Sequence, residues 1–418
     1  MSRSRKLGAA LLGAALCLAL VACTPDEPPK TATPKPTATV TKTGDGVLRV
    51  GSIFATTGAQ SYLGPGQAAG VTAALADINA AGGVLGVPAE VLTGDAGDVT
   101  TKTMESTYGV LVSKGADVVV GPSSSVLAER VLPAVVTARV PLISPAATSV
   151  RLSGLDDSGY LFRTISSAAQ EGTVFAKAIG KARTALVFLD DETGEAVLGN
   201  FRSAIAATKG TLATSQPFQN GTTDFAPIVT AVTASKPDAV VLVSPFSSVT
   251  QNMALITALS AAGFGGSKLW LSSGAMADYS QALPAGALTG VNGVLEGADA
   301  GAAFTAKVKA ADATVTDYLY AAEAYDATIL AALAATVADD DGGPAIAKNL
   351  RAVSEGGTRC TTYADCLDVL KKRSNIDYDG FSGPISFDSA GDVHSGHFGL
   401  YRYDAANRFA RVADAIGG

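Results

Sequence analysis

The chain has 418 residues, of which 47% are hydrophobic and 17% are charged, and this composition is typical of a globular protein with about two to three domains. The formal net charge is −7, and it would be −10 without the three basic residues at the N-terminus. A nucleic-acid partner is therefore disfavoured, because phosphates need a basic surface. Only two histidines are present, which disfavours a histidine-based catalytic site or a zinc cluster.

The N-terminus has the pattern of an export signal. Arg3, Arg5 and Lys6 form a cationic head, and residues 7–22 are an apolar run that is too short for a comfortable membrane span. The run ends at Cys23, and the small residues before this cysteine resemble the lipobox of bacterial lipoproteins, whose cysteine is acylated and becomes the new N-terminus. The sequence thus predicts a signal peptide over residues 1–22 and a lipid on Cys23 that holds the protein on the outer face of the cell membrane. The alternative is an ordinary signal peptide with an incidental cysteine.

Residues 23–46 contain the lipidated cysteine and a segment rich in Pro and Thr that lacks apolar periodicity. Such a segment is typical of a linker that is stiffened towards polyproline II. At about 3.1 Å per residue it would reach roughly 70 Å at full extension. We interpret it as a spacer without a site of its own.

Four cysteines are present, of which Cys17 is lost with the signal peptide and Cys23 carries lipid. Cys360 and Cys366 remain as an even pair in an oxidising compartment, so the expected state is a disulfide. The spacing does not fit a redox pair of the CxxC type, and no further metal ligands lie near these two residues in the sequence. No metal or cofactor is expected.

From residue 47 onward, short β-rich runs alternate with longer helical patterns. The first set predicts strands over residues 48–54, 89–92, 117–121 and 141–143 and helices over residues 67–81, 99–113 and 126–138. The second set predicts strands over residues 184–189, 239–243 and 268–271, helices over residues 195–207, 250–262 and 318–337, and short strands in the tail from 383 to 412. Two successive runs of this kind predict an α/β fold with two doubly wound, Rossmann-like lobes.

Ligands of open α/β sheets bind beyond the carboxyl ends of the strands. This rule selects five loops, at residues 55–66, 121–125, 144–148, 190–194 and 244–248. The second and third loops combine hydroxyl groups with backbone amides near a helix start, which suits a carboxylate. The three serines at 123–125 have no histidine nearby that could act as a base, so the pattern does not favour a hydrolase.

Five segments, in this order along the chain, resemble the periplasmic solute-binding proteins of the leucine/isoleucine/valine type, which feed ABC importers. They are residues 74–84, 120–125, 141–148, 325–327 and 381–388. The resemblance implies the type I periplasmic binding protein fold, with two lobes joined by three crossovers near residues 163–167, 294–298 and 381–384. It implies a first lobe of residues 47–165 plus 298–382 and a second lobe of residues 166–297 plus 383–418.

The resemblance also implies a ligand site. In similar proteins the residues that match Ser125 and the Thr148 amide hold the ligand carboxylate, and those that match the Ala146 carbonyl and the Thr148 hydroxyl hold its ammonium group. Tyr62 and Tyr320 stand where the family has aromatic or apolar walls. The full set of expected ligand-binding residues is Ser124, Ser125, Ala146, Ala147, Thr148, Tyr62, Tyr320, Thr193 and Ser273.

The second lobe departs from the family pattern. Thr193 stands where the family often has tyrosine, and residues 272–274 read Ser-Ser-Gly where amino-acid binders have a glutamate. A buried ammonium group without a counter-charge costs several kcal/mol. Two explanations stay open: another acid, such as Asp191, Glu192 or Asp278, meets the ammonium group, or the ligand is not a simple α-amino acid.

The main functional hypothesis is a substrate-binding lipoprotein of an ABC importer that carries no catalytic activity. It would be a monomer that closes on a small amino acid of the branched-chain type, or on a related carboxylate or amide, and then docks on ABC permease subunits. Its contact with the membrane would be through the lipid alone. A sensory receptor module of the same fold is the alternative, and a surface hydrolase is a third hypothesis that lacks a base.

Overall fold

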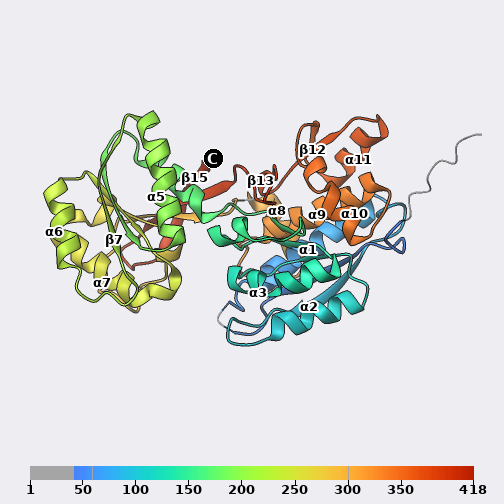
Figure 1. Ribbon diagram of the computed structural model, residues 1–418, viewed down its shortest axis with the longest axis horizontal. Helices are drawn as coiled ribbons and strands as arrows, with labels where there is room; N and C mark the ends of the chain where they lie inside the picture. Colours follow the sequence, from blue (N-terminus) through green and yellow to red (C-terminus); the bar gives the residue numbers. More distant parts are fainter. Residues whose placement is uncertain (1–41, 59, 300) are drawn as a thin grey trace, which may run out of the picture. The chain divides into compact units, whose positions relative to one another are not determined.

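The computed structural model describes residues 42–58, 60–299 and 301–418. The predicted signal peptide, Cys23 and all but the end of the predicted linker lie outside the described residues. The described chain contains a five-stranded sheet, a seven-stranded sheet and a small three-stranded sheet, with helices between the strands (Figure 1). The predicted α/β class is therefore confirmed.

The first sheet has the strand order β2-β1-β3-β4-β5, and all of its strands are parallel. Its strands are β1 (Arg49–Phe54), β2 (Glu90–Asp95), β3 (Val118–Val120), β4 (Leu142–Ser144) and β5 (Leu161–Arg163), and the helices between them are α1 (Gly64–Ala80), α2 (Thr103–Ser113) and α3 (Ser125–Ala138). Helices cover both faces of the sheet. Val118 and Val120 join the apolar core on the α1 side, while Val119 joins the core beneath α2 and α3. This two-sided burial explains why β3 is apolar throughout.

The second sheet has the strand order β15-β14-β10-β9-β8-β6-β7. Its strands are β6 (Arg183–Leu189), β7 (Thr211–Phe218), β8 (Ala239–Val243), β9 (Leu269–Leu271), β10 (Asn292–Glu296), β14 (His397–Tyr403) and β15 (Phe409–Ile416), and its helices are α4 (Glu171–Ile179), α5 (Glu192–Ile205), α6 (Ala226–Ser235) and α7 (Val249–Leu259). β14 runs antiparallel to both of its neighbours, and the other pairs are parallel. The sequence prediction missed β7, because this edge strand is largely half-exposed and contains Pro217.

Four helices and the small sheet follow β10. They are α8 (Gly301–Ala311), α9 (Ala321–Ala338), α10 (Gly343–Asn349), α11 (Tyr363–Lys371), β11 (Thr358–Cys360), β12 (Ile376–Gly380) and β13 (Gly383–Pro384). By length and composition α9 could cross a membrane, but 83% of it is buried inside the protein, so it is a core helix. It packs closely on α1, because Gly70 has no Cβ: a methyl group there would lie 2.3 Å from the carbonyl oxygen of Ala321. The predicted disulfide between Cys360 and Cys366 is present.

Three apolar side chains of the segment before β14 pack with the helices α1 and α9. Ile385, Phe387 and Val393 are buried in the same apolar core as α1 and α9. The expected boundary at residue 383 would separate these side chains from the core in which they pack. The lobe boundary itself stays a prediction.

A buried arginine joins three parts of the chain next to this return. Arg163, at the end of β5, is fully buried, and its Nε donates to Asp392 Oδ1 at 2.6 Å. The same guanidinium group donates to the carbonyl oxygens of Ala147 at 3.1 Å and Ser149 at 2.8 Å and to the hydroxyl of Ser153 at 2.8 Å. It thereby links the loop after β4 to the segment that precedes β14.

Removal of one member of this pair should be costly. We expect Asp392→Ala to lower the free energy of unfolding by about 3–5 kcal/mol, because it leaves the Arg163 charge buried without a partner. Urea denaturation followed by circular dichroism measures this change. The double variant Arg163→Met/Asp392→Leu should recover part of the loss, since it buries no unpaired charge. A loss below about 1 kcal/mol for Asp392→Ala, the value of a surface pair, would contradict this account.

Candidate functional site

A cavity of about 330 Å³ lies at the carboxyl ends of strands from both large sheets. The loops after β3 and β4 contribute Ser125, Thr148 and Ser149 to its wall. The loops after β6, β8 and β9, together with the first residue of α4, contribute the opposite wall. This is the position that the strand-end rule predicts, and the volume is in the range of small-molecule sites.

The wall on the side of the first sheet is built around the start of α3. The Ser124 hydroxyl caps this helix and accepts from the Leu127 amide at 3.5 Å. Ser125 is the first residue of the helix, and its hydroxyl accepts from the Ser149 amide at 3.1 Å. Its hydroxyl proton stays available to a ligand, since a serine hydroxyl both donates and accepts. The positive end of the helix dipole makes this wall suited to a carboxylate.

Hydrogen bonds of the Ser144 side chain hold the loop after β4 in place. The Ser144 hydroxyl donates to the Pro122 carbonyl at 2.6 Å and accepts from the Ala147 amide at 3.0 Å. Ala146 is 8% exposed and Ala147 is fully buried, and neither lines the cavity. Of the residues expected in this loop, Thr148 alone reaches the cavity wall, while the two alanines lie behind it.

The two expected aromatic side chains do not line the cavity. Tyr62 is 61% exposed in the loop before α1. Tyr320 precedes α9 with a left-handed backbone, at a φ of 61°, and its ring lies against Gly297. A Cβ at Gly297 would lie 3.4 Å from that ring, and the residue's φ of 112° also favours glycine.

Thr193 and Ser273 lie on the second wall, as does Asp191. Asp191 caps α5, and its Oδ1 accepts from the Gly194 amide at 2.8 Å. The other two acids considered from the sequence do not line the cavity: Glu192 is exposed, and Asp278 lies 3.7 Å from Arg408.

The second wall contains an acid that the sequence analysis missed. Glu171, the first residue of α4, lines the cavity although its side chain is only 1% exposed. Its carboxyl group lies within hydrogen-bonding reach of Glu296 at the end of β10, which is equally buried. Ser273 bridges the two: its amide donates to Glu171 Oε1 at 2.9 Å, and its hydroxyl lies 3.3 Å from Glu296 Oε1. Burial, followed by the charge of Glu296, raises the pKa of Glu171 well above its ordinary value, and burial also raises the pKa of Glu296.

The sequence did contain a signal for Glu171. It is an acid at the first turn of the helix that follows the first crossover. The strand-end rule selects only loops that follow strands, and Glu171 follows no strand directly. Only the folded chain brings it next to Ser273, across 102 residues of sequence.

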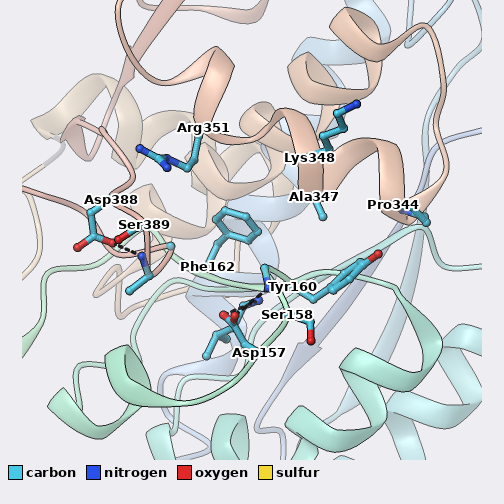
Figure 2. A pocket seen from close by; sticks show the side chains of 14 residues that line it. Asp157, Ser158, Tyr160, Phe162, Pro344, Ala347, Lys348, Arg351, Asp388 and Ser389 are labelled. Atoms are coloured by element: carbon cyan, nitrogen blue, oxygen red, sulfur yellow. Dashed lines mark hydrogen bonds between the residues drawn. The ribbon is translucent and has the colours of Figure 1, made fainter.

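A second cavity, of about 280 Å³, lies between residues 157–162, α10 and residues 388–391 (Figure 2). The rings of Tyr160 and Phe162 lie on its wall. The carboxylates of Asp157 and Asp388 are already occupied, because they accept backbone amides of their own turns at 2.8 Å. Arg351 donates to the Phe387 carbonyl at 3.1 Å. The first cavity is therefore the better candidate for a ligand site.

Comparison with known proteins agrees with this geometry. The model of a family described as periplasmic binding protein matches residues 47–404. The chain belongs to this family. A comparison with curated proteins finds no match.

Solved structures share the fold of this periplasmic binding protein. The branched-chain amino acid binding protein LivJ of Streptococcus pneumoniae, solved with isoleucine, has 21% identity and a TM-score of 0.61, and the match covers 88% of this chain and 99% of that one. A substrate-binding protein of Desulfitobacterium hafniense, solved with Leu, has 18% identity and a TM-score of 0.63, with 87% and 99% covered. A solute-binding protein of R. palustris, solved with 4-hydroxybenzoate, has 18% identity and a TM-score of 0.60, with 88% and 97% covered. The family and the fold that the resemblance implied are confirmed, and the chain is a binding protein rather than an enzyme.

The start of α9 makes hydrogen bonds to the three segments where the chain is expected to cross between the two lobes. The Glu323 carbonyl accepts from the Thr164 hydroxyl at 2.8 Å, and its carboxylate Oε1 accepts from the Ala298 amide at 2.8 Å. One turn later, Asp326 Oδ2 accepts from the amide and the hydroxyl of Ser382, both at 2.6 Å. Burial raises the pKa of Glu323 to about 7 and that of Asp326 to about 6.

The titration of Glu323 should be visible in the stability of the protein. Its pKa is raised on folding, so the native state binds more protons, and stability is lost as pH rises from about 4.5 through about 7. We expect Glu323→Gln to remove this loss, which is about 3 kcal/mol for a shift of this size. Denaturation of both proteins at pH 4.5 and 8 measures the difference. Parallel pH profiles of the wild type and the variant would contradict the prediction.

Proposed function

We propose that this protein is the lipid-anchored solute-binding component of an ABC importer, and that it binds a small amino acid of the branched-chain type or a related carboxylate. The observation that carries the proposal is the cavity at the strand ends of both sheets, which has a helix start on one wall and a buried acid on the other. The chain's membership of the periplasmic binding protein family supports it.

The charges of the two walls suit a ligand with opposite charges at its two ends. Ser125 and Thr148 offer hydroxyl groups and the positive end of α3 to a carboxylate. Glu171 and Asp191 are the charged residues on the other wall, and the described lining includes neither lysine nor arginine. An α-amino acid places a carboxylate and an ammonium group a few ångströms apart, and so it matches both walls.

The structural neighbours bind two kinds of ligand. Two of the reported neighbours were solved with isoleucine or leucine and one with 4-hydroxybenzoate, and at their low identity the likeness alone does not choose between these ligands. The acid on the second wall favours an amino acid here. A benzoate would leave the Glu171 carboxyl group facing an aromatic ring with no cation to meet it.

The form in which the two predicted lobes are closed on the ligand would be the form that an ABC permease recognises. The ligand can favour a closed state only through contacts that are better in that state than in the open one. Ser125 and Glu171 belong to the two opposing walls, so a zwitterion that touches both provides such contacts. Bending would occur at the three segments that α9 holds together.

Isothermal titration calorimetry with leucine, isoleucine, benzoate and 4-hydroxybenzoate tests the proposed binding. We expect an amino acid to bind and Ser125→Ala to weaken its affinity about 10-fold, the value of one hydrogen bond to a charged group. Ser203→Ala, on the exposed side of α5, is the matched control and should bind like the wild type. Mass spectrometry of small molecules released on denaturation would identify a retained ligand. If no probe binds, no molecule is retained and Ser125→Ala behaves like the wild type, the proposal is wrong.

The lipid anchor is a separate part of the proposal, and Cys23 lies outside the described residues. We expect Cys23→Ser to release intact protein into the medium, because a modified cysteine with several acyl chains provides the membrane affinity. Cell fractionation with immunoblotting measures the release, and calorimetry on the released protein should give the wild-type affinity. Retention of the variant in the membrane fraction would point to an uncleaved signal segment as the anchor.

A further inference from the structure

Two carboxyl groups lie side by side in a buried site at the edge of the cavity. Glu171 and Glu296 are each 1% exposed, and they come from different elements, the start of α4 and the end of β10. Ser273 offers them one amide and one hydroxyl group. Two carboxylates this close in a buried site cannot both be ionised without a cation, so the pair titrates as a unit.

Cations on the surrounding elements are engaged elsewhere. Lys177 of α4 donates to the carbonyl oxygens of Ile416 and Gly418, and Arg402 of β14 lies 3.4 Å from Asn292 Oδ1. Arg411 of β15 donates to the Gly297 carbonyl and pairs with Asp414. The other titratable groups on packed or neighbouring elements are Asp191, Glu192, Glu195 and Arg202 of α5 and its cap, Tyr320 and Glu323 near Gly297, His397, Tyr401 and Tyr403 of β14, and Lys268, which precedes β9.

A second observation points to a ligand at the same wall. Ser244, which follows β8, lines the cavity and is 4% exposed. Its hydroxyl finds no hydrogen-bond partner among the described residues. A buried hydroxyl without a partner costs free energy, so this wall is suited to a polar group that comes from outside the chain. Ser244 and Glu171 thus line the same cavity.

We propose that Glu171 and Glu296 share one proton and present a single negative charge, which recognises the ammonium group of the ligand. This inference rests on the proposed function and specifies its second wall. The shared proton lets the pair stay buried, while the remaining charge is balanced when the ammonium group arrives. The pair thereby takes the role for which Asp191, Glu192 and Asp278 were considered.

Glutamine substitutions test the sharing, because an amide beside a carboxylate mimics a protonated carboxyl group beside a carboxylate. With leucine and isoleucine as probes, Glu171→Gln and Glu296→Gln should each bind within about 10-fold of the wild type, since each keeps one negative charge. The double variant should lose at least about 100-fold, because no charge then meets the ammonium group. Glu195→Gln, an exposed acid on α5, is the matched control and should bind like the wild type.

The same variants give a readout that needs no ligand. A pair with raised pKa values holds protons that the unfolded chain releases, so the stability of the wild type should fall as pH rises above about 4.5. This fall should be smaller in both single variants, which should be more stable than the wild type at pH 8. Identical pH profiles of stability in the wild type and the single variants would overturn the shared proton.

Each outcome of the binding experiment bears on the inference. If one single variant loses as much affinity as the double variant, or if the double variant binds like the wild type, the shared charge is wrong while amino-acid binding stands. If 4-hydroxybenzoate binds and both amino acids do not, the protein is still a solute-binding protein but the ammonium site is wrong. If none of the probes binds and no retained molecule carries an ammonium group, the proposed ligand class and the inference fall together.

Discussion

The buried hydrogen bonds at the start of α9 impose the constraint on which the rest of the structure depends. A protein that closes on a ligand must let its chain cross between lobes, and each crossing segment carries backbone groups that need partners when they are buried. The Glu323 carbonyl accepts from the Thr164 hydroxyl and its carboxylate accepts from the Ala298 amide. The Asp326 carboxylate accepts from the Ser382 amide. Because one helix start serves all three segments, the predicted crossings are held together in space although they lie far apart in the sequence.

The ligand loops depend on a similar arrangement on the other side of the first sheet. Arg163 holds the carbonyl oxygens of Ala147 and Ser149, and Asp392 neutralises its charge. The residue that ends the last strand of this sheet therefore also fixes the loop that carries Thr148 to the cavity. These rigid contacts lie behind the cavity wall to which Ser125 and Thr148 belong.

The sequence predicted the parts of the fold that depend on local pattern. The apolar runs of β3 and β8 and the periodic helices α1 and α3 were all predicted from their residues, because burial on both faces or on one stripe leaves a clear pattern. The half-exposed edge strand β7 has no such burial pattern in its sequence. The wall that carries Ser125 and Thr148 was predicted as well, because loops after strands meet at one edge of a sheet. The predicted lobe boundaries and the roles of the individual site residues stay predictions.

Glu171 was not predicted from the sequence, because the residues of a binding wall are brought together by folding and need not be neighbours in the sequence. Related proteins are expected to supply an acid from the loop after the strand that β9 matches, and here that loop supplies Ser273 instead. The Ser273 amide binds a carboxylate that comes from the start of α4, so the charge reaches the same wall by a different element. The lack of an acid in one loop therefore does not by itself determine ligand specificity, because a neighbouring helix start can supply the acid instead. The different origin of the acid also changes its chemistry. Glu171 lies beside a second carboxyl group, that of Glu296, whereas a single acid on the loop after β9 would have no such neighbour.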